Sequence, residues 1–159
     1  MARADFTVYD ARNAGGAVAT RYAVEGDGTS TILAGEMLRQ DTGAGDTEYA
    51  QLAADGDGNT RVWLGPATSD SDETTSADGS VWVFDNVLTI FKGRASTISN
   101  LTASVRLTQV TLDVAAGTNG RQPIDENDTT NGTFRIMDFD ATPGHVFFMN
   151  AVLDHISAG

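Results

Sequence analysis

The sequence lacks cysteine altogether and contains lysine at a single position, Lys92. Without cysteine, disulfide bonds and thiolate zinc sites are excluded. No apolar run approaches the roughly 20 residues that a membrane-spanning helix needs. The first residues, MARAD, also carry no apolar core of a secretion signal. We therefore expect neither a disulfide-stapled domain nor contact with a membrane.

Basic residues are scarce in general. Ten Lys and Arg stand against 22 Asp and Glu, which gives a formal net charge of −12 at pH 7. Nucleic-acid binding needs clustered Lys and Arg to meet the phosphates, so this charge opposes a nucleic-acid partner. An acidic surface keeps a protein soluble, and it also suits an environment of high salt. The sequence leaves both interpretations of the charge open.

Residues that commonly carry catalysis are few, and histidine occurs only at His145 and His155. The sequence holds no Gly-x-Ser-x-Gly elbow, no P-loop and no His-Glu-x-x-His zinc motif. Asp138 and Asp140 share one face of a predicted strand, an arrangement that a glycosidase or a metal site can use. A pair of this kind more commonly faces solvent. We therefore expect no enzyme, no cofactor and no bound metal.

An acid-rich segment at residues 55–59, DGDGN, begins like a calcium-binding loop, with acids at alternate positions. An EF-hand loop needs Gly at its sixth position and a bidentate Glu at its twelfth, where this sequence has Thr60 and Pro66. We interpret the segment as a hairpin turn instead, because Asp, Asn and Gly tolerate the backbone conformations of tight turns.

Short apolar runs rich in Val, Thr and aromatic residues are what the sequence does contain, separated by Gly, Pro, Asn and Asp. Such runs predict β-strands. No segment shows a sustained helical period, and no repeat of fixed length is visible. At 159 residues the chain fits one domain with its own core. We predict a mainly β fold, a single compact sandwich or barrel over residues 17–159 with long polar loops.

The central stretch, residues 61–93, reads RVWLGPATSDSDETTSADGSVWVFDNVLTIFKG. It predicts strands at 62–64, 81–84 and 87–91, the last two joined as a hairpin at Asp85-Asn86. Residues 67–80 form a polar loop, which we expect to be exposed and tolerant of insertions.

The two tryptophans of this stretch, Trp63 and Trp82, each lie inside an apolar strand. We expect both to pack in the core, as large aromatic side chains commonly do. Truncation of Trp82 to alanine is then expected to cost about 3–5 kcal/mol of stability. The alternative is that the two rings form an exposed platform that stacks on sugars.

The N-terminal segment, residues 1–16, contains the strand-like piece Phe6-Thr7-Val8-Tyr9 ahead of a flexible join, NAGG, at residues 13–16. The segment is either the first strand of the sheet or an extended arm that reaches a neighbouring molecule. In the second case Phe6, Val8 and Tyr9 are the candidate partner-binding residues.

The C-terminal third has two further features. Apolar positions within residues 96–114 change phase at Thr108-Gln109, which predicts either a β-bulge or a turn between two strands. Residues 115–132 form a second long polar loop, and loops of this length are usually functional or mobile.

A resemblance to a known family rests on two segments. Residues 32–38, ILAGEML, combine apolar residues with Ala, Gly and an acid. In the central stretch, an apolar strand and Gly lead into a Thr/Ser-rich loop with ETT and Ala-Asp-Gly. A second strand, a turn and an apolar run ending in Lys-Gly follow. Over roughly residues 22–99 this order resembles the head decoration (capsid cement) proteins of tailed bacterial or archaeal viruses.

The resemblance implies a small β-tulip-like domain that binds the outer surface of an icosahedral head during assembly in the host cytoplasm. Its partners would be the major capsid protein and further copies of itself, as a homotrimer at local three-fold axes. No reaction is involved. Two other functions stay open. One is another virion component, in the tail, the neck or the base of a head fibre. The other is a carbohydrate-binding β module that uses Trp63, Trp82 and calcium.

Overall fold

The computed structural model describes residues 6–11, 19–26, 31–41, 49–53, 63–85, 89–113, 122–130 and 132–150. Strands dominate these residues, which confirms the predicted mainly β fold. Within these ranges the helical pieces are two short 3-10 turns, η2 (Ile98–Asn100) and η3 (Ala103–Val105). The predicted flexible join at residues 13–16 and the acid-rich turn at 55–59 lie outside the described ranges.

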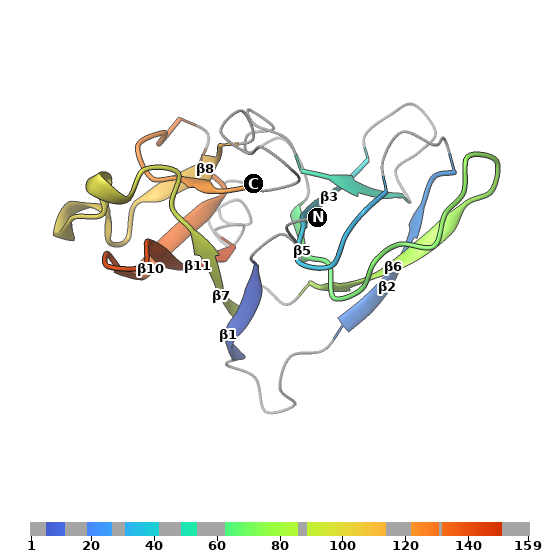
Figure 1. Cartoon of the computed structure of the whole chain (residues 1–159), viewed down its shortest axis with the longest axis horizontal. Helices are drawn as coiled ribbons and strands as arrows, with labels where there is room; N and C mark the ends of the chain where they lie inside the picture. Colours follow the sequence, from blue (N-terminus) through green and yellow to red (C-terminus); the bar gives the residue numbers. More distant parts are fainter. Residues whose placement is uncertain are drawn as a thin grey trace, which may run out of the picture.

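One antiparallel sheet of six strands forms the left half of the molecule in Figure 1. It curls strongly, like half of a barrel. Burial alternates along two of its strands, Phe134–Asp140 and His145–Asn150, so one face of these strands packs on the core, as period-two side-chain alternation requires. In spatial order the strands are β1 (Thr7–Ala11), β7 (Thr89–Arg94), β11 (His145–Asn150), β10 (Phe134–Asp140), β8 (Gln109–Leu112) and β9 (Ile124–Asp125).

Two smaller antiparallel sheets form the right half of Figure 1. β2 (Ala19–Val24) pairs with β6 (Gly79–Phe84). β3 (Met37–Gln40) lies between β4 (Ala50–Leu52) and β5 (Trp63–Pro66). Single bridges between Ala67 and Val83 and between Ala23 and Tyr49 hold the two small sheets together.

The predicted hairpin at Asp85-Asn86 is wrong. β6 pairs with β2, whereas β7 pairs with β1 and β11, so the chain passes from one half of the molecule to the other between them. Asp85 fixes this passage, because its carboxylate accepts a hydrogen bond of 2.7 Å from the hydroxyl of Tyr22 on β2. Burial, reinforced by this bond, raises the pKa of Tyr22 to about 12.

The N-terminal segment is a strand of the six-stranded sheet where the structure describes it. β1 pairs with β7, and Phe6 just before it is 5% exposed, with its ring edge-on to Phe148 at 5.4 Å. Gly93 makes this possible, because a Cβ there would lie 2.5 Å from the Phe6 ring. The arm interpretation is therefore wrong for these residues. Phe6 is corrected from a partner-binding residue to a core residue.

The hydrophobic core divides into two clusters. The larger one lies against the six-stranded sheet and includes Trp63, whose ring is 4.8 Å from that of Phe134. At 4% exposure, Trp63 confirms its predicted place in the core. The smaller cluster lies between the two small sheets. Its members are Val24, Ile32, Leu38, Ala50, Leu64, Ala67, Val81 and Val83.

The side chain of Gln122 joins the two halves. It precedes β9, is 7% exposed, and reaches the three-stranded sheet. Its Oε1 accepts the N–H of Met37 at 2.6 Å, and its Nε2 donates to the carbonyls of Met37 (3.2 Å) and Ala53 (2.9 Å). One amide side chain therefore satisfies buried backbone groups in the way that a neighbouring strand would.

A buried carboxyl lies in the turn before β3. Glu36 is 4% exposed, and its Oε2 accepts the N–H of Leu33 at 2.7 Å. Burial raises the pKa of Glu36; the hydrogen bond from Leu33 opposes that rise, and the nearby charge of Asp70 adds to it. The folded state therefore favours the protonated form of this group more strongly than the unfolded chain does.

We expect Gln122→Leu to lower the free energy of unfolding by about 2–4 kcal/mol, because it leaves buried backbone groups without partners. Urea unfolding measures this loss. Gln122→Glu keeps the acceptor for the Met37 amide but turns a carboxylate toward two carbonyl oxygens, so we expect at least as large a loss at neutral pH. An unchanged midpoint for Gln122→Leu would contradict the bridging role.

We expect Glu36→Gln to raise Tm at neutral pH, with the gain shrinking as the pH falls. A group whose folded pKa is raised contributes stability below its unfolded pKa and loses it as the pH rises through the folded value. Glutamine stays neutral and still accepts from Leu33, so the variant escapes that loss. Melting curves from acid to neutral pH measure the difference. Parallel profiles for the two proteins would show that Glu36 is not the cause.

Candidate interaction surface

The carboxylates of the loop between β5 and β6 act as acceptors for backbone N–H groups. Asp70 accepts the N–H of Ala34 at 2.8 Å, which ties the loop to the turn before β3. Asp72 accepts the N–H of Ser80 at 2.6 Å and its hydroxyl at 3.2 Å, which closes the loop on itself. These bonds lower the pKa of Asp72, so the carboxylate stays ionised.

Asp78 connects three segments. Its carboxylate accepts the N–H of Gly26 at 3.0 Å and the hydroxyl of Tyr49 at 2.8 Å, and these bonds lower its pKa. Ser71 adds a further tie, since its hydroxyl accepts the N–H of Ile32 at 2.9 Å. Residues 74–78 are exposed as predicted, but the loop is anchored along most of its length. Asp70, Asp72 and Asp78 thus hold the loop in place.

The Asp138 and Asp140 pair faces solvent, as the sequence predicts. Asp140 lies opposite His145 across β10 and β11. Among the described residues no three His, Asp or Glu side chains are placed to hold a metal ion. Asp138 has another partner, an arginine from a different segment.

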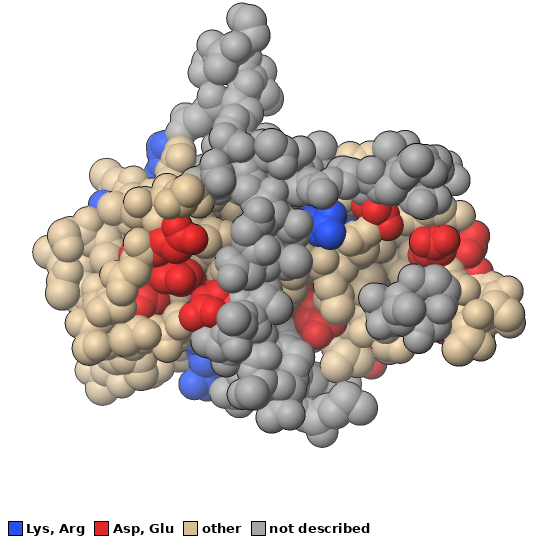
Figure 2. Space-filling view, turned by 90° about the horizontal axis from the view of Figure 1, so that it is seen from above, with Lys and Arg blue, Asp and Glu red and all other residues tan. Residues whose placement is uncertain are grey.

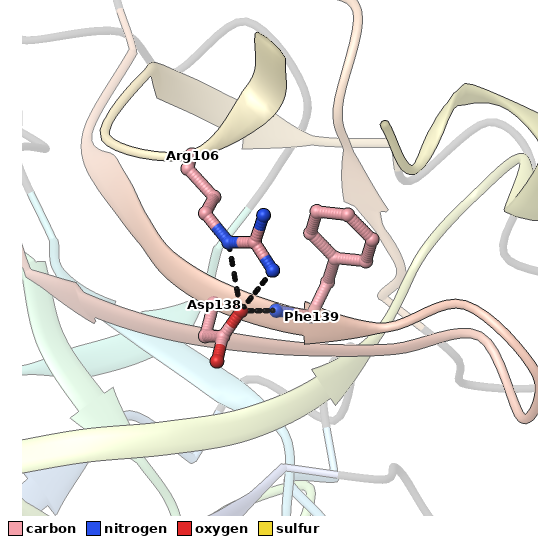
Figure 3. A network of polar contacts seen from close by, with 3 residues as sticks. All are labelled: Arg106, Asp138 and Phe139. Carbon is pink, nitrogen blue, oxygen red and sulfur yellow. Dashed lines mark hydrogen bonds and ion pairs between the residues drawn. The ribbon is translucent and has the colours of Figure 1, made fainter. Parts of the chain in front are cut away.

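Arg106 and Asp138 form a salt bridge on the surface (Figure 3). The Nε and Nη2 atoms of Arg106 both lie 2.9 Å from Oδ1 of Asp138, and the guanidinium lies 4.6 Å from the centre of the Phe139 ring. The same oxygen accepts the N–H of Phe139, and these contacts lower the pKa of Asp138. The Arg106 side chain is thus held in one conformation while 47% of it is exposed.

Leu107 follows directly and is unusual in two ways. Its side chain is 65% exposed, and its φ of 63° places it in the left-handed region. That conformation costs a leucine about 1–2 kcal/mol. The turn explains the change of apolar phase at Thr108-Gln109: β8 begins at Gln109, and no bulge is involved. The residues before it, expected as a strand, form η2 and η3 instead.

Ile98, in η2, is a second exposed apolar residue of this half. It is 50% exposed and lies against the β10–β11 turn, where a Cβ on Gly144 would be 2.6 Å from its side chain. Both 3-10 turns lie at the left end of Figure 1. We name Ile98, Arg106, Leu107 and Asp138 the end patch. Sequence reasoning missed it, and its one signal was the change of phase after Leu107.

Trp82 is 48% exposed, so the expectation that it lies in the core is wrong. On β6 the burial falls on Val81 and Val83, which alternate with it and fill the smaller core cluster. Arg21 lies directly opposite Trp82 across β2 and β6. Because Trp63 is buried, the two tryptophans cannot form a shared platform.

The remaining predicted site residues lie on β1. Tyr9 is 62% exposed, with its ring 4.3 Å from that of Phe147 on the neighbouring part of the sheet. Val8 belongs to β1, but its side chain lies outside the described part of the structure. Phe6 is therefore buried in the core, whereas Tyr9 is exposed and stays a predicted partner-binding residue.

On the face seen in Figure 2 acidic side chains are more extensive than basic ones: they lie over both halves of the molecule, whereas basic side chains appear at only a few places. No helix among the described residues has the length and apolar character of a membrane crossing. Comparison with known proteins found no matching family model, curated protein or solved structure.

We expect Asp78→Ala to lower Tm, because it releases both Gly26 and Tyr49 from the loop. A short tag inserted between Thr75 and Ser76 is expected to leave Tm nearly unchanged, since both residues are exposed at the tip of the loop. Ser76→Ala is the matched control for a substitution without lost contacts. A tag that lowers Tm more than Asp78→Ala does would contradict this division of the loop.

Proposed function

We propose that this protein is a virion structural protein that decorates and stabilises the outer surface of an icosahedral viral head. Its partners are the major capsid protein and further copies of itself, in a symmetric oligomer such as a trimer. It performs no reaction. The likeness of residues 22–99 to head decoration proteins and the mainly β fold both support this proposal.

The observation that carries the proposal furthest is the end patch. Leu107 keeps an apolar side chain exposed at a backbone conformation that glycine would adopt without strain. Arg106 is already held by Asp138 and Phe139, so little conformational entropy is lost when it meets a partner. The exposure and the backbone strain of Leu107 do not benefit the isolated fold. Both residues suit a surface that contacts another protein.

The charge of the end patch also suits a protein contact. Arg106 and Asp138 offset each other, in a chain whose formal net charge is −12. Like charges facing each other across an interface oppose association, whereas a locally neutral apolar patch allows a close approach. The end patch is thus a place where this acidic protein can meet another surface without repulsion.

Symmetry would turn such a modest contact into a durable one. The end patch is small, so a single copy is expected to bind weakly. In a symmetric oligomer the second and third copies attach intramolecularly, and avidity can gain on the order of 10²–10⁴. A head with many equivalent positions is the kind of target on which this gain is realised.

The direct test is to add the purified protein to expanded heads of its virus that lack it. We expect an oligomer that binds in numbers approaching those of the major shell subunit and raises the melting temperature of the shell. A monomer that neither binds nor stabilises the shell would overturn the proposal. Binding limited to a few copies per particle would assign the protein to the tail, the neck or a fibre base instead.

A substitution at Leu107 separates the roles in binding and folding. We expect Leu107→Gly to weaken attachment to the shell while Tm stays the same or rises. Relief of about 1–2 kcal/mol of strain outweighs the extra chain entropy of glycine, about 0.5–1 kcal/mol. Ser76→Asp, in the exposed loop of the other half, is the control that keeps attachment. Normal attachment by Leu107→Gly would show that the end patch is not the contact.

A further inference from the structure

We propose that the β2–β6 ribbon carries a binding site for a neutral saccharide, built around Trp82. This inference does not depend on the end patch or on attachment to a viral head. It begins from a side chain whose position the core does not explain. Trp82 is 48% exposed, yet its neighbours Val81 and Val83 are completely buried and hold the strand in place.

Both polar backbone groups of Trp82 have partners in residues 68–69. Its N–H donates to the hydroxyl of Ser69 at 3.4 Å, and its carbonyl accepts the N–H of Thr68 at 2.7 Å. A tryptophan has only two side-chain torsions to restrain. An indole on such a strand therefore offers a preformed flat apolar surface, and binding a ligand to it costs little further ordering.

Polar groups that suit hydroxyls border the ring. Arg21 is the direct cross-strand neighbour of Trp82, a position whose Cβ atoms lie about 4.5–5.5 Å apart in antiparallel pairs. Asp72 accepts the hydroxyl of Ser80, which lies on the same face of β6 as Trp82, and the charge of Arg21 is among the causes that lower the pKa of Asp72. The hydrogen bonds from Ser80 both use Oδ1 of Asp72, and Oδ2 takes part in neither. The site thus combines a guanidinium donor with an ionised carboxylate acceptor.

This combination matches the chemistry of a pyranose ring. One face of such a sugar presents C–H groups that pack on an aromatic ring, while its edge presents adjacent hydroxyls that both donate and accept hydrogen bonds. Arg21 can donate to one hydroxyl while Asp72 accepts from the next. The acids of the adjoining loop, Asp70, Asp72 and Asp78, oppose an anionic sugar, so the site fits a neutral one.

A protein partner fits this place less well. An aromatic residue at the centre of a protein interface is surrounded by contacts that exclude water. The neighbours of Trp82 on the same face of β6 are Ser80 and Phe84, of which Phe84 packs against the larger core cluster, and the opposing residue is Arg21. The other large exposed hydrophobic residues of the described structure, Tyr9, Ile98 and Leu107, belong to the six-stranded half. A single ring bordered by polar groups suits a small ligand.

The test uses the full-length protein and a panel of neutral oligosaccharides: maltohexaose, cellohexaose, chitohexaose, mannohexaose and xylohexaose. We expect saturable binding to at least one of them by calorimetry, together with a change in the exposed tryptophan emission. Trp82→Ala should weaken that binding about tenfold or more, whereas Trp82→Phe keeps part of it. Arg21→Ala should weaken it as well, and Leu107→Gly should leave it unchanged.

Three results would overturn the proposal. One is the absence of binding to every sugar of the panel and to a broad array of glycans. Another is equal binding by Trp82→Ala and the parent protein. The third is a Trp82→Ala variant that binds shells or its own oligomer less well while no glycan binds either protein, which would make Trp82 a protein contact. Attachment to shells is measured separately with Leu107→Gly. A failure of the saccharide proposal can therefore be told apart from a failure of the proposed attachment to the viral head.

Discussion

The amide of Gln122 is the contact on which the arrangement of the two halves depends. It satisfies both polar backbone groups of Met37 and the carbonyl of Ala53, at the place where the three-stranded sheet meets the six-stranded one. Met37 and Ala53 also belong to the larger core cluster, so the amide holds part of the hydrophobic core in position. A buried network of this kind specifies one arrangement, because every alternative leaves polar groups without partners.

The Asp and Glu residues also have a structural role that the net charge does not reveal. In the described residues several carboxylates accept hydrogen bonds from backbone N–H groups. Asp70, Asp72 and Asp78 do so in one half of the molecule, and Glu126 accepts the N–H of Thr97 in the other. Such contacts are short-ranged and depend on geometry. They therefore respond less to dissolved salt than exposed pairs of opposite charge do. The chain combines a strongly negative surface with loops that its own acids hold in place.

Local pattern in the sequence predicts the strands but not their partners. The mainly β fold, the burial of Trp63 and the exposed Asp138 and Asp140 all follow from residue type and alternation. The predicted hairpin at Asp85-Asn86 is wrong because the sequence of two strands separated by a turn is the same whether the strands pair with each other or enter different sheets. The predicted burial of Trp82 is wrong because the local sequence of a strand does not show which of its faces is buried. Tertiary packing decides that.

The candidate surfaces were still harder to predict, because each joins residues distant in sequence. Nothing in the residue Arg106 signals Asp138, 32 positions later. In the sequence Gly93 is only the end of an apolar run. In the structure its missing side chain makes room for Phe6, which the pairing of β1 with β7 brings near. The change of phase after Leu107 was visible, but its meaning depended on a backbone dihedral angle.

The order of strands in the large sheet has a consequence for synthesis on the ribosome. β11, the strand nearest the C-terminus among those described, occupies an inner position between β7 and β10. β1 can join only β7, which in turn needs β11 beside it to become an inner strand. A nascent chain therefore exposes apolar strands until residue 150 has left the exit tunnel, and long-range pairings of this kind form slowly. The small sheets, which close within residues 19–84, can form first and serve as the template on which the rest of the molecule assembles.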